Sequence, residues 1–429
     1  MTSGTCAWRV FVYNLTSPLD DNHAMAKVTH KIYHAAPTDQ RQSLVQAFGN
    51  HLGGALYESH AHALTPILEH RLRFSRCRTY DPSQADLIYA PLLPMPRLNI
   101  GNAEYPRVCA RITVAEVSRQ LTHLSSPAAA CRHFFSQPHH YHLWNCTGWF
   151  AEPTGLFVHA MRIGYLHALD SYYPADGYKA LHRYPKPMPS VPYPSCVHWS
   201  SELERDASLE RGNISASAWN ATNYFRVTRR DVLAGRQPPR RPLLMLFVGG
   251  SWHGDTSVRK RVEAQCKALY PLCEFRPFNG CPSAMHHKQR ATFCLEPHGD
   301  SPDRKSVSDD VSAGCIPVFF SNASYALTPW FWAVGDGGKG TGAGGDDDQE
   351  SRLLIDRDAF LKGSVTLRSA LASIPAAAIE RMQRRLARIA LGFQYSTDAQ
   401  HGDAVDLIMR NLKIQADACV AAGSSAPYK

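Results

Sequence analysis

The chain has 429 residues, with 46 Lys or Arg against 37 Asp or Glu, a formal net charge of +9 at pH 7. Its 44% hydrophobic content excludes a disordered chain, and no apolar run approaches the ~18 residues of a transmembrane helix, so we expect a soluble protein of two or three domains. The basic residues are spread along the chain without a zinc-finger spacing, a basic zipper or an RNA-binding aromatic signature. We therefore expect an anionic small ligand such as a sugar nucleotide, and no nucleic-acid partner.

Short apolar runs alternate with helical or loop stretches, which is typical of an α/β protein with parallel sheets. In the first half, residues 8–15, 85–93 and 155–161 predict three buried strands. A Pro/Arg-rich linker then runs from residue 236 into an aliphatic strand that ends at Gly249 and Gly250. We therefore expect two α/β domains, 1–235 and 236–429.

The second half predicts two more buried strands, 291–297 and 314–320, with a helix between them. Residues 335–348 are glycine-rich and predict a flexible loop. A further helix is expected to begin at Ile374-Pro375, because proline is favoured in a first helical turn. Its apolar residues recur on one face and its arginines on the other, which indicates ordinary amphipathic packing. The apolar set is Ile379, Met382, Leu386, Ile389 and Phe393, and the basic set is Arg381, Arg384, Arg385 and Arg388.

The segment FCLEPHGDSPDRKSVSDDVSAGCIPVFF, residues 293–320, carries the most chemistry. A buried strand ends at Glu296-Pro297, a turn follows, and a short helix begins near Arg304 and ends at Gly314. In an open α/β sheet, ligands bind at the carboxyl ends of the strands. A helix N-terminus at that edge offers free N–H groups and a partial positive charge to a phosphate. The segment therefore predicts a nucleotide-phosphate site.

Several side chains of this segment suit such a ligand. Arg304, Lys305 and Ser306 would supply positive charge and a hydroxyl to the phosphates. Gly299 permits close approach of the backbone, and Asp309 could accept hydrogen bonds from ribose hydroxyls.

Each of these residues also has a plain structural alternative. Ser301 or Asp303 could cap the helix, since both residue types are favoured at that position. Lys305 and Asp309 could form an i,i+4 ion pair on the surface, which contributes only a few tenths of a kcal/mol. The spacing alone leaves both alternatives open.

The twelve cysteines include no C-x-x-C pair, which excludes a redox motif and a zinc ribbon. Cys266, Cys273 and Cys281 suit a disulfide-bearing loop better than a metal site, whereas Cys294 and Cys315 could be buried free thiols. Five N-x-[ST] sequons occur, at Asn14, Asn145, Asn213, Asn220 and Asn322. Together these features favour the lumen of the secretory pathway. Asn14 is the least favoured glycosylation site, because we expect its strand to be buried.

Five blocks, in order, resemble the exostosin-like glycosyltransferases, most closely the plant and green-algal branch that includes the xyloglucan galactosyltransferases. The resemblance covers most of the chain. Two positions depart from the family pattern: Arg132 stands in place of an Asp, and Ser308 in place of a Phe. The blocks are VFVYNL (10–15), ADLIYAPLLP (85–94), VPYPSCVHW (191–199), RPLLMLFVGGSWHGDTSVRKRV (241–262) and the segment 293–320.

The resemblance implies a GT-B fold, in which two Rossmann-like domains face one cleft. It implies an inverting transfer from a UDP-sugar, held by the C-terminal domain, to a hydroxyl of a polysaccharide or protein-linked glycan. It also implies a homologous glycosyltransferase subunit as a partner, and a type II membrane protein of the Golgi lumen. The donor-binding residues it implies are Gly249, Arg259, Pro297, Gly299, Asp300, Ser301, Arg304, Lys305, Ser306 and Asp309.

No metal or other cofactor is expected, because cationic side chains and a helix N-terminus can stabilise the leaving diphosphate. Asp346 and Asp348 form a D-x-D in the glycine tract, but a solvated acidic loop is favoured over a metal site. His139, His140 and His142 are favoured as surface residues.

The catalytic base is not identified by the sequence. His133 is a weak candidate, because it lies in a matched block and titrates near neutrality, and a packed, hydrogen-bonded histidine is the favoured alternative. A catalytically silent homologue that acts as a scaffolding subunit is the second functional hypothesis. The departures at Arg132 and Ser308 would support it.

Overall fold

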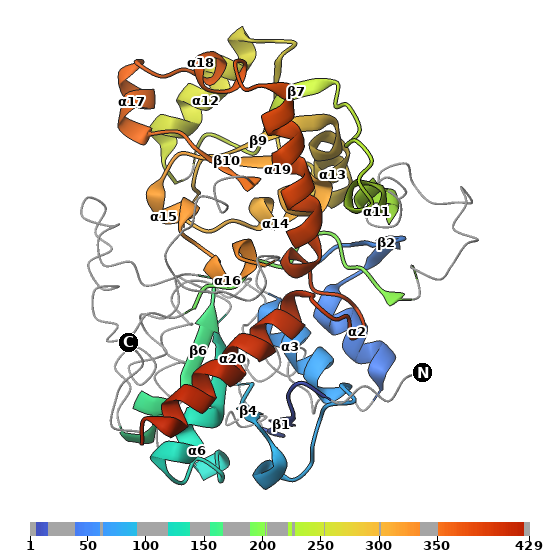
Figure 1. Ribbon diagram of the computed structural model, residues 1–429, viewed down its shortest axis with the longest axis vertical. Coiled ribbons are helices and arrows are strands. Elements are labelled where there is room, and N and C mark those ends of the chain that lie inside the picture. Colours follow the sequence, from blue (N-terminus) through green and yellow to red (C-terminus); the bar gives the residue numbers. More distant parts are fainter. Residues whose placement is uncertain are drawn as a thin grey trace, which may run out of the picture. The chain divides into compact units, whose positions relative to one another are not determined.

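The computed structural model describes residues 6–15, 39–60, 63–91, 119–137, 155–165, 189–201, 203, 222–224, 228–252, 254–299, 302–334 and 351–423. The chain forms two compact units (Figure 1). Unit 1 comprises Met1–Ala47, His62–Val191 and Ile408–Lys429, and unit 2 comprises Phe48–Ala61 and Pro192–Leu407. The units therefore do not follow the expected division at residue 235, because unit 2 begins earlier and takes in a segment from near the N-terminus. The roles expected for 1–235 and 236–429 stay a prediction.

Unit 1 contains a parallel sheet of four strands in the order β1-β4-β5-β6. Its buried side chains, such as Val10, Leu87 and Phe134, are 0% exposed. The strands are β1 (Val10–Val12), β4 (Leu87–Tyr89), β5 (His133–Gln137) and β6 (Met161–Gly164). The helices are α2 (Gln40–Phe48), which ends at the first residue of unit 2, α3 (Leu64–Arg73) and α6 (Pro127–Arg132), with 3-10 turns η1 (Pro82–Gln84) and η2 (Gly155–His159).

Two strands of unit 1 differ from expectation. The third expected strand, 155–161, forms the 3-10 turn η2 instead, and β6 begins only at Met161. Gly155 has a φ of +58°, which breaks an extended run, and a short apolar stretch does not by itself separate a strand from a helical turn. β5 is a strand that the sequence pattern missed, because it follows directly after α6 without turn residues.

Unit 2 contains a parallel sheet of five strands in the order β11-β10-β9-β7-β8. The strands are β7 (Leu243–Val248), β8 (Cys273–Arg276), β9 (Ala291–Glu296), β10 (Ile316–Phe319) and β11 (Leu353–Leu354), and β2 (His51–Gly53) and β3 (Leu56–Tyr57) form a separate antiparallel pair. The chain runs from β7 to β8 on one side, then crosses to β9 on the other side of β7. The strand order therefore reverses between β7 and β9. The expected α/β class with parallel sheets is confirmed.

The helices of unit 2 cover both faces of this sheet, which explains why every residue of β9 is buried. α12 packs on β7 and β8, whereas α14 packs on β9 and β10 (Figure 1). The helices are α11 (Arg229–Leu233), α12 (Thr256–Ala268), α13 (Gly280–Arg290), α14 (Lys305–Ala313), α15 (Asn322–Tyr325), α16 (Pro329–Trp332), α17 (Arg357–Lys362), α18 (Leu367–Leu371), α19 (Ala376–Ile389), the 3-10 turn η6 (Ala390–Phe393) and α20 (Ala404–Ala421), which continues into unit 1.

The expected helices after residues 303 and 375 are confirmed as α14 and α19. One arginine of α19 departs from the expected division of this helix into an apolar face and a basic face. Arg385 is only 5% exposed and donates from Nη2 to the carbonyl oxygen of Trp332 at 3.0 Å. The glycine-rich loop 335–348 lies outside the described residues. In the part of the chain that the structure describes, no helix has the length and apolar character to cross a membrane.

All ten described cysteines form disulfides, and Cys109 and Cys146 lie outside the described residues. The expected involvement of Cys266, Cys273 and Cys281 in disulfides is confirmed. The alternative of free thiols at Cys294 and Cys315 is wrong, because the ends of two neighbouring strands bring their sulfur atoms together. The bridges are Cys6–Cys77, Cys131–Cys419, Cys196–Cys281, Cys266–Cys273 and Cys294–Cys315.

Candidate functional site

The candidate site lies in unit 2, where the loops after β7 and β9 meet. In an open α/β sheet, the point at which strand order reverses leaves a crevice at the carboxyl ends of the strands. Gly254, in the loop after β7, has a φ of +71°, and a Cβ there would lie 2.2 Å from the carbonyl oxygen of Gly299. Only glycine fits so close to the loop after β9. The two loops therefore form one continuous surface at this edge of the sheet.

Two arginines converge on this surface. Arg259 of α12 donates from Nε to the carbonyl oxygen of Gly250 at 2.6 Å and from Nη1 to that of Pro297 at 3.1 Å. Arg304 donates from Nη1 to the same Pro297 oxygen at 3.1 Å. One carbonyl oxygen thus holds two guanidinium groups, although like charges repel each other. Oε2 of Glu296 lies 3.5 Å from Nε of Arg304 and offsets part of this charge, so the group of three carries a net positive charge that suits an anionic ligand.

Two glycines give these arginines room. A Cβ at Gly249 would lie 3.0 Å from Nη2 of Arg259, and a Cβ at Gly299 would lie 3.1 Å from Nη1 of Arg304. Any larger residue would push against a guanidinium group. The structure thus brings together Gly249, Arg259, Pro297, Gly299 and Arg304, five of the donor-binding residues that the resemblance implies, and their contact with a donor stays a prediction. Asp300 and Ser301 lie outside the described residues.

The N-terminus of α14 adjoins the arginine pair. Its N-cap is Arg304, whose own side chain makes no capping hydrogen bond. The proposed cap Asp303 accepts instead from the N–H of Arg304 itself, at 2.8 Å. Burial raises the pKa of the Asp303 carboxyl well above its usual range, which favours its neutral form. The first helical turn therefore keeps the positive character that attracts an anion.

Ser306 turns away from the crevice and into a buried network. Its hydroxyl donates to Oε1 of Glu296 at 2.6 Å and accepts from Nζ of Lys288 at 2.9 Å. Lys288 is 2% exposed and also pairs with Asp310. Burial lowers the pKa of Lys288, but Asp310 and Glu296 outweigh this effect and raise it. The serine therefore links β9, α13 and α14 and has no free hydroxyl in this arrangement.

Lys305 and Asp309 also face inward. Lys305 lies 3.6 Å from Asp309, as the i,i+4 spacing predicts, but Asp309 is only 3% exposed rather than at the surface. Oδ1 of Asp309 accepts from the hydroxyl of Ser195 at 2.9 Å and from the N–H of Cys196 at 2.7 Å. Burial lowers the pKa of Lys305, and Asp309 opposes this shift. The pair thus holds α14 against residues 195–196, and a ribose contact by Asp309 stays a prediction.

Sequence reasoning missed Lys288 and Glu296. Glu296 lies inside the segment 293–320, at the end of a buried strand, and a charged residue there is itself a signal of a paired role. Lys288 lies in the last turn of α13, and no sequence motif marks it. Only the packing of α13 against α14 reveals its place in the network.

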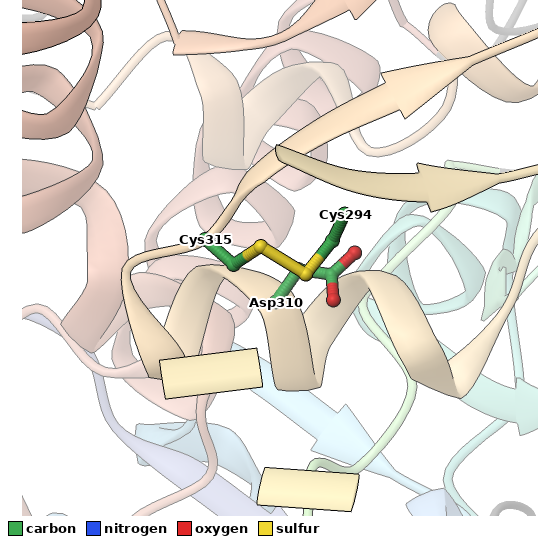
Figure 2. Close-up of side chains that lie close together, drawn as sticks. All are labelled: Cys294, Asp310 and Cys315. Carbon is green, nitrogen blue, oxygen red and sulfur yellow. A yellow bond between two sulfur atoms is a disulfide. The ribbon is translucent and has the colours of Figure 1, made fainter. Parts of the chain in front are cut away.

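One group of three described side chains could offer ligands to a metal ion, namely Cys294, Asp310 and Cys315 (Figure 2). Figure 2 shows the two sulfur atoms joined in a disulfide beside the carboxylate. A disulfide sulfur is not a thiolate, which is the form that binds metals. The carboxylate is also paired with Lys288. This group therefore does not offer a metal site in its oxidised form. The D-x-D of Asp346 and Asp348 and the histidines 139, 140 and 142 lie outside the described residues.

His133, in unit 1, is fully buried at the start of β5. Its Nδ1 lies 2.7 Å from the carbonyl oxygen of Ala129, and its Nε2 lies 3.1 Å from the hydroxyl of Tyr13. Burial lowers the pKa of His133 to about 4. This geometry matches the packed, hydrogen-bonded alternative. Arg132 donates to the carbonyl oxygen of Ala85 at 2.8 Å, which is a structural contact.

Comparison with known proteins finds a family match in the same part of the chain. Residues 189–329 match the Exostosin GT47 domain. A probable xyloglucan galactosyltransferase GT12 of Arabidopsis thaliana is 32% identical over 157 residues, which are 35% of this chain and 28% of the relative. A probable xyloglucan galactosyltransferase GT15 of the same plant is 34% identical over 155 residues, 34% of the chain and 27% of the relative.

A third plant relative is the xyloglucan galactosyltransferase MUR3 of Arabidopsis thaliana, which is 31% identical over 191 residues. The match covers 40% of this chain and 29% of the relative, so the chain spans less than a third of the length of each of these three proteins. The matched domain contains β7, β9, both arginines and α14. Residues 189–329 thus match the exostosin GT47 domain, and the predicted resemblance to the plant xyloglucan galactosyltransferases is confirmed.

Proposed function

We propose that this protein is an inverting glycosyltransferase of GT-B architecture. It moves a sugar from a UDP-sugar to a hydroxyl of a polysaccharide or protein-linked glycan. The observation that carries the proposal is the convergence of Arg259 and Arg304 on the Pro297 carbonyl, beside a helix N-terminus, where the strand order reverses. The expected donor contacts are Gly249, Arg259, Pro297, Gly299, Asp300, Ser301 and Arg304, whereas Lys305, Ser306 and Asp309 hold the helix that presents them.

The chemistry follows from the leaving group. As the acceptor oxygen attacks the anomeric carbon, the bond to the nucleoside diphosphate breaks and negative charge grows on the departing phosphate. Two guanidinium groups and the free N–H groups of α14 are placed to stabilise that charge. These interactions become stronger than in water where the bound donor excludes solvent from them. We propose that the reaction needs no metal ion or other cofactor.

The names of the relatives suggest which ligands to test first. They are described as xyloglucan galactosyltransferases, and one further relative is a xyloglucan-specific galacturonosyltransferase. UDP-galactose and UDP-galacturonic acid are therefore the first donors, and xyloglucan oligosaccharides the first acceptors. A homologous glycosyltransferase subunit is a further proposed partner.

Donor binding and turnover test the proposal together. We expect calorimetric titration to detect UDP binding by the full chain, with affinity unchanged after EDTA treatment. At least one UDP-sugar of a panel should be hydrolysed, and transferred when an acceptor is present. Affinity that falls on chelation and returns with manganese would contradict the metal-free mechanism. UDP binding without any turnover would favour the catalytically silent homologue, and absence of UDP binding would contradict the donor site itself.

The disulfides and the glycosylation sequons help to identify the cellular compartment of the protein. Five disulfides among the described cysteines fit an oxidising lumen. The expected burial of the strand before Asn14 is confirmed for β1, but the strand ends at Val12, and Asn14 is exposed, as is Asn322, the other described sequon asparagine. We propose a type II protein of the Golgi lumen. Secretory expression in a eukaryotic host should yield glycan on these asparagines, and bare sequons with free thiols would contradict it.

A further inference from the structure

An exposed tryptophan stands beside the proposed donor site. Trp252 follows β7 at the carboxyl edge of the sheet and is 69% exposed. Single apolar residues on a surface are common, so exposure alone carries no conclusion. What distinguishes Trp252 is where its ring lies and what holds the backbone beneath it.

The indole lies against Gly250. A Cβ at Gly250 would lie 2.5 Å from both Cη2 and Cζ2 of Trp252, so the six-membered ring covers the position that a side chain would occupy. The carbonyl oxygen of Gly250 accepts the 2.6 Å hydrogen bond from Nε of Arg259. The same arginine that belongs to the anion site therefore fixes the backbone on which the ring rests. The indole has one side on this backbone and most of its surface open to solvent.

The spacing suits a nucleoside diphosphate. β7 and β9 are hydrogen-bonded neighbours, with Leu246 opposite Cys294, and adjacent strands lie about 4.8 Å apart. Arg304 and the N-terminus of α14 follow β9, whereas Trp252 follows β7. A nucleoside diphosphate whose phosphates bind at the end of β9 can thus direct its ribose and base towards the end of the neighbouring strand β7, which Trp252 follows. Nucleotides bind across such a reversal of strand order in open α/β sheets.

We propose that Trp252 is the stacking surface for the uracil base of the donor. This inference rests on the proposed function, and it assigns the base to the loop after β7 and the diphosphate to the loop after β9. Aromatic side chains stack on bases through their π-faces, and the loss of such a contact weakens binding by about five- to a hundredfold.

The test compares three ligands with four proteins. The ligands are UDP, uridine and inorganic diphosphate, and the proteins are the parent chain, Trp252→Ala, Trp252→Phe and Tyr270→Ala. Tyr270 is a matched control, because it is 71% exposed and precedes β8, at the opposite end of the sheet. Each variant is first checked for the melting temperature of the parent.

We expect Trp252→Ala to weaken UDP and uridine alike, by about five- to a hundredfold, and to leave inorganic diphosphate unchanged. Trp252→Phe should recover most of the affinity, and Tyr270→Ala should bind like the parent. A Trp252→Ala variant with parental affinity for UDP and uridine would overturn the inference and leave the proposed function intact. Equal weakening of inorganic diphosphate, or a loss confined to UDP-sugars, would also overturn it. A parent chain that binds no UDP would remove the proposed function as well.

Discussion

Charged residues in unit 2 fall into two groups according to the partners they meet. Arg259 and Arg304 donate to backbone carbonyl oxygens of the loops after β7 and β9, and Nε of Arg304 also lies 3.5 Å from Oε2 of Glu296. Lys288 and its partner Asp310 are buried, whereas Lys305 is 18% exposed and pairs with the buried Asp309. Glu296 offsets part of the charge of Arg304, whereas Lys288 and Lys305 are each paired with an aspartate of α14. The first group is thus suited to binding, and the second to holding the site together.

Asp309 tests this division. Asp309→Asn removes the charge that strengthens the hydrogen bonds from Ser195 and Cys196, which we expect to lower the free energy of unfolding by about 1.5–3 kcal/mol. Affinity for UDP should change little once the variant is folded. Denaturant titration and calorimetry measure both quantities, with Asp358→Asn as an exposed control. Equal loss of affinity for UDP and uridine, with parental stability, would instead support a ribose contact.

The sequence predicts the place of a residue where a local motif or a backbone requirement determines it. Gly299 and Arg304 follow a buried strand and open a helix, and this local pattern predicts their place. Lys288 and Glu296 could not be assigned, because their partners come from other elements. The role of His133 could not be predicted for a similar reason. Its chemistry depends on its burial, and no local sequence pattern indicates that it is buried.

At the scale of elements, α14 is positioned at both ends. Its first turn adjoins the arginine pair, and its last turn ends at Gly314, which has a φ of +67°. Both the helix and its glycine stop follow from the local sequence, because glycine is the preferred residue for a left-handed helix end. β5 and β8 were not predicted, since a strand of four or five residues with polar members has no clear alternation.

Gly314 also leaves room for its neighbours. A Cβ there would lie 2.6 Å from the ring of Tyr224 and 2.8 Å from Nη2 of Arg241. Gly402 has a φ of +82° but nothing within 4 Å of such a Cβ. We expect Gly402→Ala to cost about 1 kcal/mol of unfolding free energy for its backbone conformation. Gly314→Ala should cost at least ~1 kcal/mol more, because the ring must move.

Denaturant unfolding of both alanine variants measures this difference. Equal costs would show that Tyr224 and Arg241 move aside freely, and that the end of α14 is held by backbone conformation alone.

For the whole molecule, stability depends on groups buried in both units. His198, in unit 2, has Nδ1 2.6 Å from the carbonyl oxygen of Tyr395, and burial lowers its pKa to about 3. Burial lowers the pKa of His133 in unit 1 to about 4. Both histidines must therefore gain a proton when the chain unfolds below their ordinary pKa.

This linkage predicts the sign of the pH dependence. Because the folded pKa values are depressed, the stabilisation is present above about pH 6.5 and is lost as pH falls towards 4 and then 3. Each histidine contributes a slope of up to ~1.4 kcal/mol per pH unit within its window. Burial raises the pKa values of Asp303 and Asp310, which act in the opposite direction, so variants must be compared.

We expect His198→Gln to flatten the fall of the thermal midpoint between pH 6.5 and 4. His401→Gln, which removes an exposed imidazole, should keep the parental slope. An unchanged slope in the His198→Gln variant would show that this histidine does not titrate between the folded and unfolded states as its burial requires.

The central claim is that the surface formed by the loops after β7 and β9 binds the diphosphate of a sugar nucleotide. Calorimetric titration of Arg304→Ala with UDP and uridine tests this claim most directly. Removal of a charge-assisted contact should weaken UDP by about ten- to a hundredfold, with a smaller loss for uridine, which has no phosphates. The control Arg236→Ala, whose side chain is 73% exposed in unit 2, should bind both ligands like the parent. Parental affinity of the Arg304→Ala variant for UDP, with an unchanged melting temperature, would contradict the claim.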